Sequence, residues 1–264
     1  MNALSEGVRW LWALSIVCQI AVPTALFLRK NAQKLPFFTA CAVLNLMQAA
    51  LFLVLRAMPQ SQAPIFGEVA WSSQGVILLS QALAATEVLG VTLKPYPGIW
   101  GLGWRVLALG SGLVLVVVVA VSRSGWIYAR WFDLNRGYHV VFSTAMIACL
   151  LLIRYYAIPM PGAYKLLLGG FCFYSCAEIL INTILQALFY QHFAYYEPVW
   201  QFATMSSFVV AEGMWLTGLR HPLPELAAPD PRAAASAPAR LIEIHAKLRE
   251  VNDKLGQLWK LEAR

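Results

Sequence analysis

Long apolar stretches recur along this chain, and only short polar segments separate them. The sequence is 59% hydrophobic and 12% charged, which is more apolar surface than the core of one soluble domain can bury. About 20 apolar residues form a helix long enough to cross the roughly 30 Å hydrocarbon layer of a bilayer. The pattern therefore predicts an all-α, polytopic membrane protein with the lipid bilayer as its main partner.

We expect seven membrane-spanning helices, because charged residues, Pro or Gly bound each apolar stretch. The expected spans cover residues 8–28, 35–56, 68–92, 99–122, 133–157, 164–190 and 199–219. No convincing small-residue cleavage site follows the first of them, so we interpret it as a retained helix rather than a secretory signal. Together these spans predict a seven-helix transmembrane domain over residues 1–220.

Lys and Arg in short loops indicate the orientation, since these residues resist translocation. The side with the greater excess carries the basic tail and Arg29, Lys30, Lys34, Lys94, Arg154 and Lys165, whereas the opposite side carries Arg9, Arg56, Arg123, Arg130 and Arg136. With seven spans, this bias predicts an N-terminus outside and a C-terminus in the cytoplasm, in a cell (inner) membrane. The net charge of +7 mostly reflects the same asymmetry. Without a soluble fold to carry a basic face, no nucleic-acid partner is expected.

Tryptophans fall near the proposed span ends, where they favour an interpretation as interfacial anchors. The outer set is Trp10, Trp12, Trp71, Trp126, Trp131 and Trp200, and the inner set is Trp100, Trp104 and Trp215.

Ionisable residues at membrane depth are costly, so each is a candidate functional residue. Glu87, Arg105 and Glu212 are expected at a similar depth, roughly 10 Å above the inner face at 1.5 Å per helical residue. Two interpretations remain open. These groups form an ion pair that fixes the order of the helices, or they bind a proton, a cation or another ligand.

Polar residues form a stripe along the span at 164–190, at spacings that place them on one helical face. The stripe consists of Ser175, Glu178, Asn182 and Gln186; Ser73, Gln74, Ser80 and Gln81 lie in the third span, and Asn45 and Gln48 in the second. Lipid does not tolerate such a face. We therefore expect either a polar cavity between helices or interhelical hydrogen bonds that specify packing. Gly169 and Gly170 are expected to permit close helix contact.

The sequence lacks the residues that several familiar cofactors and catalytic motifs require. The chain resembles the retinal-binding rhodopsins in span number and orientation, but residues 199–219 contain no Lys for a Schiff base, so the resemblance covers architecture alone. Paired haem histidines, a P-loop, H-E-x-x-H and a complete G-x-G-x-x-G are also absent. We expect no cofactor and no enzymatic activity.

A metal site at the outer rim is the weaker of two interpretations for two histidines. His139 and His192 are expected near Glu68, Asp133 and Glu197, and imidazole with carboxylate is metal-ligand chemistry. The spacing is loose, however, so an ordinary polar rim without metal is favoured. The five cysteines all fall within expected spans and are interpreted as buried apolar residues.

The tail divides into a linker and a helix. Residues 221–239 are rich in Pro and Ala, which indicates a semi-rigid linker. Residues 240–264 show apolar spacings of three and four that define three heptads, at Leu241, Ile244, Leu248, Val251, Leu255 and Leu258. Glu243 with Lys247 and Glu250 with Lys254 are positioned to support this helix by i to i+4 pairing.

This heptad helix favours a homo-oligomeric coiled coil, with docking on the membrane surface or the bundle as the first alternative and a partner protein as the second. As a whole, the sequence favours a non-enzymatic seven-helix sensor, receptor-like protein or scaffold that oligomerises through its C-terminal helix. A proton or cation channel or transporter that uses the buried Glu residues is the first alternative. An accessory subunit of a larger membrane complex is the second.

Overall fold

The computed structural model describes residues 2–56, 63–105, 108–109, 112, 127–155, 158, 160–189, 193–224, 250–254 and 257. Within them all regular structure is helical, and no strand occurs. The helices are α1 (Asn2–Leu28), α2 (Pro36–Arg56), α3 (Ala63–Leu93), α5 (Ile127–Tyr155), α6 (Gly162–Phe189) and α7 (Phe193–Gly218). Residues 97–105 are also helical and begin the expected fourth span, most of which lies outside the described residues.

Five of these helices are long and apolar enough to cross a membrane. The crossing segments are Glu6–Leu28, Pro36–Leu55, Ser72–Leu93, Leu134–Tyr155 and Gly162–Ile184. Large apolar side chains are exposed on the outside of the bundle, among them Trp10, Leu28 and Ile184, which suits lipid rather than water as the surrounding solvent. The prediction of an all-α chain is thereby confirmed, and the five apolar helices suggest integration into a membrane; the count of seven spans stays a prediction. α7 is long enough as well, but its polar residues keep it outside this set of five.

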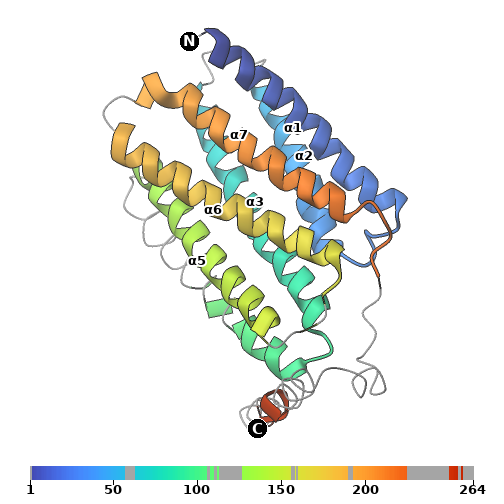
Figure 1. Cartoon of the computed structure of the whole chain (residues 1–264). Helices are drawn as coiled ribbons and strands as arrows, with labels where there is room; N and C mark the ends of the chain where they lie inside the picture. Colours follow the sequence, from blue (N-terminus) through green and yellow to red (C-terminus); the bar gives the residue numbers. More distant parts are fainter. Residues whose placement is uncertain are drawn as a thin grey trace.

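The helices pack as a bundle in which neighbours in the chain are mostly neighbours in space (Figure 1). α1 contacts α2 and α7, and α7 contacts α6; α6 also contacts α5 and α3, and α3 in turn contacts α2 and α5. Helices α1, α2, α6 and α7 therefore enclose one part of the interior. α3 and α6 bring the two halves of the chain together.

An aromatic cluster fills the interior between α2, α6 and α7. The rings of Phe38 and Phe171 lie 5.7 Å apart in an edge contact, and Phe171 and Trp215 lie 4.8 Å apart. The indole Nε1 of Trp215 donates to the Leu167 carbonyl oxygen at 3.1 Å, and this side chain is 3% exposed. The prediction that Trp215 is an interfacial anchor was therefore wrong. Because α7 passes close to Gly170, the indole is directed into the core rather than towards the rim.

The chain after α7 returns to the turn between α1 and α2. Lys30 adopts a left-handed conformation with φ of 57° and ends α1, as is common just past a helix C-terminus. The next residue, Asn31, is fully buried. Its Oδ1 accepts the Leu223 N–H at 2.9 Å, and its Nδ2 donates to the His221 carbonyl oxygen at 3.4 Å. The first residues of the tail are thus attached to the bundle.

Candidate functional site

Glu87 binds the N-terminus of a neighbouring helix. Its carboxylate oxygens accept the backbone N–H groups of Phe37 at 3.1 Å and of Phe38 at 2.8 Å. α2 begins at Pro36, and the preceding residue, Leu35, has no side-chain acceptor for the free N–H groups of the first turn. Glu87 supplies that acceptor from α3, and its negative charge also complements the positive end of the α2 dipole. This carboxylate therefore has a structural role.

Glu212 has no such partner. It lies on α7, is 2% exposed, and its Oε2 is buried without a hydrogen-bond partner. Arg105 is half-buried, and among the described residues no ion pair joins it to Glu87 or Glu212. The three groups that the sequence places at one depth thus do not share an ion pair.

Glu178 and Asn182 form a second buried polar group on α6. Asn182 Nδ2 donates to Glu178 Oε2 at 3.0 Å and to the Glu178 carbonyl oxygen at 2.8 Å. Glu178 Oε1 and Asn182 Oδ1 are buried without partners. Thr204 of α7 lies near this carboxylate, but its hydroxyl is also without a hydrogen-bond partner. The polar stripe of α6 is buried as predicted at Ser175, Glu178 and Asn182, which are each at most 3% exposed; the side chain of the fourth residue, Gln186, lies outside the described residues.

His139 lies in the interior rather than at a polar rim. It is fully buried, its Nδ1 lies 3.2 Å from the Ser175 hydroxyl, and its Nε2 has no partner. The rings of Tyr138 and Tyr174 contact it at 5.2 and 5.7 Å. The prediction of a polar rim position was wrong, because this face of α5 packs against Ser175 and Tyr174 of α6. The side chains of Glu68, Asp133, His192 and Glu197 lie outside the described residues.

Hydrogen bonds join the polar residues of α2 and α3. Gln48 Nε2 donates to Ser73 Oγ at 3.1 Å and to Gln74 Oε1 at 3.3 Å. Here the polar lines specify packing, which is one of the two interpretations that the sequence left open. The other interpretation, a polar cavity, has support near Glu212, where Gln19 of α1 also contributes.

The described part of the C-terminal helix packs against the bundle of its own chain. Asn252 Oδ1 accepts the Gly98 N–H at 2.8 Å, and a Cβ at Gly98 would overlap the Asn252 carbonyl oxygen. Figure 1 shows the short red helix of the tail beside the turn after α3. The predicted pair of Glu250 and Lys254 is confirmed at 2.6 Å. Of the heptad residues, Val251 is half-buried; Leu241, Ile244, Leu248, Leu255 and Leu258 lie outside the described residues.

Three residues in these contacts were missed by the sequence reasoning: Gln19, Asn31 and Asn252. Helix 97–105 begins at Pro97 after Tyr96, a residue that cannot cap the helix. The sequence therefore indicates that this helix needs an acceptor from elsewhere, but not that Asn252 supplies it. For Asn31 and Gln19 the sequence offers no pattern beyond an isolated amide.

Metal-ligating side chains do not gather anywhere in the described part of the chain, where no group of three or more His, Cys, Asp or Glu residues could hold an ion. All five cysteines are free, and Cys41 and Cys149 are buried. Comparison of the chain with protein family models, with curated proteins and with solved structures found no match. The function must therefore be argued from the geometry of this bundle.

Proposed function

We propose that the chain is a non-enzymatic, seven-helix integral membrane protein that acts as a sensor or receptor-like scaffold, with its C-terminal tail as the output. The observation that carries this proposal is the attachment of the tail to the bundle at two places. Residues 221–224 bind the turn between α1 and α2 and the start of α6, and Asn252 binds the start of helix 97–105. A rearrangement of the helices would change both attachments.

The first attachment connects the tail directly with the core. Beside the Asn31 bonds, Lys34 Nζ donates to the Leu223 carbonyl oxygen at 2.7 Å, and the Tyr164 hydroxyl donates to the Pro224 carbonyl oxygen at 3.2 Å. Leu219 and Leu223 are buried in the same apolar core as Trp215. Since α7 leads without interruption from Glu212 to this segment, a displacement of α7 in the membrane would reach the tail.

The topology of the proposal has seven spans, with the fourth and seventh added to the five apolar helices. α7 packs on both α1 and α6, which favours a place for it within the same bundle. The attachments of the tail lie beside Lys34 and Lys94, on the side that the positive-inside rule assigns to the cytoplasm. This topology gives an N-terminus outside and a cytoplasmic tail in a cell (inner) membrane.

Self-association through the heptad helix is the proposed mode of assembly, with another membrane or cytoplasmic protein as the alternative partner. Val251 is one of the apolar heptad residues that would form the seam of a coiled coil, at position d. Asn252 follows it in the sequence and therefore lies next to this seam. Docking on Gly98 and pairing with a second copy would thus use neighbouring faces of one helix. A change in docking would alter how much of the seam is available to a second chain.

Hydrogen exchange of the tail would test the coupling. In the purified full-length chain, we expect amide protection at residues 250–254, and we expect Gly98→Ala to reduce it severalfold because its methyl group displaces Asn252. Gly103→Ala is the matched control, since a Cβ there meets nothing within 4 Å. Glu212→Gln in the bundle core should also change the protection at residues 250–254. Exchange in Glu212→Gln that is identical to the wild type would contradict the coupling, and exchange in Gly98→Ala identical to that in Gly103→Ala would contradict the docking of Asn252.

Mass measurement in detergent would test the assembly. The full chain should form an oligomer, and removal of residues 240–264 should yield a monomer. A monomer in both cases would refute the coiled coil while leaving the coupling of bundle and tail intact.

A proton or cation channel or transporter is the second candidate function. It is favoured by the buried, unpartnered oxygens of Glu178 and Glu212, because a buried carboxylate without a partner costs several kcal/mol. Glu87 contributes less to this candidate, since it binds the α2 N-terminus. Ion flux in liposomes should then fall in Glu178→Gln and Glu212→Gln. Flux that persists in the double variant, or is absent from the wild type, would exclude this candidate.

A further inference from the structure

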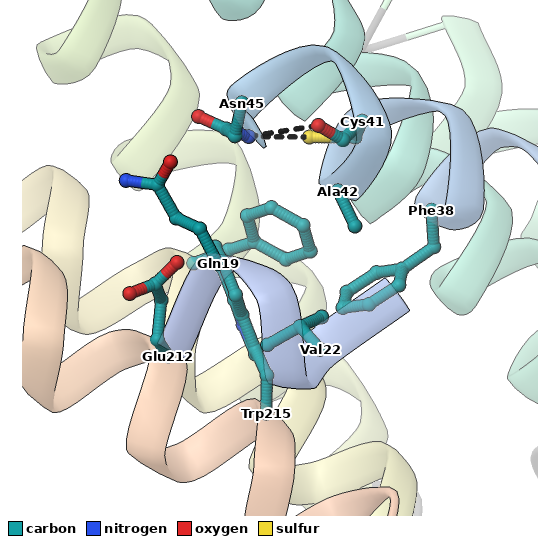
Figure 2. A pocket seen from close by; sticks show the side chains of 9 residues that line it. Gln19, Val22, Phe38, Cys41, Ala42, Asn45, Glu212 and Trp215 are labelled. Carbon is teal, nitrogen blue, oxygen red and sulfur yellow. Dashed lines mark hydrogen bonds between the residues drawn. The ribbon is translucent and has the colours of Figure 1, made fainter. Parts of the chain in front are cut away.

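A small cavity lies between α1, α2, α6 and α7, next to the aromatic cluster. Its polar lining consists of Gln19, Asn45 and Glu212 (Figure 2). Its apolar lining includes Phe38, Phe171 and Trp215. The cavity volume is about 10 Å³, which is close to the minimum for one water molecule. Any occupant is therefore the size of water.

No cationic side chain among the described residues faces the carboxyl group of Glu212. Glu212 is 2% exposed and its Oε2 has no hydrogen-bond partner. The titratable groups facing Glu212 are Cys18 of α1, Cys41 of α2, and Tyr174 of α6, with Glu178 beyond Tyr174. None of them is cationic. An ionised Glu212 would thus need a positive charge from outside the described residues.

The hydrogen bonds of the polar side chains that line the cavity also leave acceptors without partners. Gln19 Nε2 donates to Ser15 Oγ at 2.9 Å, which leaves its buried Oε1 without a partner. Asn45 Nδ2 donates to the Cys41 carbonyl oxygen at 2.9 Å and is also 3.5 Å from Cys41 Sγ. Both amide groups therefore donate to groups other than Glu212, while acceptors without a partner remain on Gln19 and Glu212. An occupant that satisfies these acceptors must supply protons or a positive charge.

We propose that this cavity binds one water-sized monovalent cation between Glu212 and Gln19, either sodium or a proton held on the carboxyl group or as hydronium. A single carboxylate balances one positive charge. Mg²⁺ or Ca²⁺ would bring two positive charges against this one carboxylate, since the other polar side chains of the lining, Gln19 and Asn45, are neutral amides. This site is independent of the attachment of the tail, so it stands whether or not the bundle passes a signal to the tail.

Thermal unfolding in different salts distinguishes sodium from the proton. The full-length chain in detergent is compared in sodium chloride and in choline chloride at equal ionic strength, since choline is too large for the cavity. If sodium is the occupant, the wild-type Tm rises with sodium concentration and Glu212→Gln abolishes this rise. Glu87→Gln is the matched control, because that half-buried carboxylate binds backbone N–H groups of α2; it should retain the sodium-dependent rise in Tm.

Infrared spectroscopy identifies the proton. If the carboxyl group itself holds a proton, the spectrum of the wild type minus Glu212→Gln contains a neutral carboxylic acid C=O band, and the sodium effect is absent. Gln19→Leu should shift this band, because the acid loses its acceptor. Should Glu212→Gln not fold, Gln19→Leu tests both arms, by a shift of the acid band or by loss of the sodium-dependent rise in Tm. A wild type that lacks both the sodium effect and a neutral-acid band altered by either variant would overturn the proposal.

Discussion

The carboxylate of Glu87 accepts the backbone N–H of Phe38 at 2.8 Å and joins the C-terminal part of α3 to the first turn of α2. Asn252 makes the equivalent bond to Gly98 in the first turn of helix 97–105. Both helices begin at a proline, Pro36 and Pro97, and neither proline is preceded by a residue that can cap. Two helix N-termini of this bundle therefore depend on acceptors from elsewhere in the chain.

Removal of the first acceptor should destabilise the bundle. We expect Glu87→Ala to lower the free energy of unfolding by about 1–3 kcal/mol, because two N–H groups lose a charged acceptor. Glu87→Gln should cost less, since its amide oxygen can still accept. Unfolding in mixed micelles measures the difference. The exposed Glu250→Ala serves as a control and should change stability by under about 0.5 kcal/mol; an equally small effect of Glu87→Ala would contradict the capping role.

The second acceptor provides a test of charge at a helix N-terminus. Asn252→Asp keeps the acceptor and adds a negative charge, which the positive end of helix 97–105 favours. Asn252→Leu removes the acceptor while keeping a similar volume. We therefore expect exchange protection of the Gly98 amide to be retained or increased in Asn252→Asp and reduced in Asn252→Leu. Equal protection in both variants would show that the side chain does not hold the tail.

The sequence predicted the positions of the helices better than the contacts between side chains of different helices. The apolar stretches gave the positions of α1, α2, α3, α5 and α6, and the spacing of Ser175, Glu178 and Asn182 correctly predicted a buried face. Burial of one face follows from the 3.6-residue period alone. The partner of Glu87 did not follow, because the depth shared with Glu212 and Arg105 says nothing about positions around the bundle.

The predicted positions of Trp215 and His139 were wrong for a similar reason. The position of a residue along a span predicts its depth in the membrane, and this depth places both residues near an interface. Depth does not determine whether a side chain faces lipid or the interior; Trp215 is directed inward beside Gly170 and His139 beside Ser175. These contacts join separate helices, so only the packed bundle reveals them.

Asn31 should control the attachment of the tail. In Asn31→Ala the buried Leu223 N–H loses its acceptor, at a cost of about 1–3 kcal/mol. Asn31→Asp keeps an acceptor for Leu223 but directs a fully buried carboxylate at the His221 carbonyl oxygen, so it should also weaken this attachment. Limited proteolysis of residues 221–239 in detergent would report detachment as faster cleavage. Cleavage of Asn31→Ala at the wild-type rate would mean that Lys34 and Tyr164 suffice to hold this segment.

Gly170 should be the least replaceable glycine of α6. A Cβ at this position would overlap Trp215 Nε1 and lie 2.7 Å from Trp215 Cδ1, well inside contact distance. Since Trp215 is held by the Leu167 carbonyl oxygen and by packing against Phe171, it cannot move without loss of both interactions.

We therefore expect Gly170→Ala to lower the free energy of unfolding by about 1–3 kcal/mol, the usual cost of overpacking a core. Gly213→Ala on α7 is the matched control, because a Cβ there meets nothing within 4 Å; it should be neutral or stabilising by up to about 1 kcal/mol through helix propensity. Unfolding of both variants in mixed micelles, with tryptophan fluorescence as the probe, measures the contrast. If Gly170→Ala were as stable as Gly213→Ala, α6 and α7 would have to separate without cost, and the close packing that directs Trp215 into the core would not be what stabilises this pair of helices.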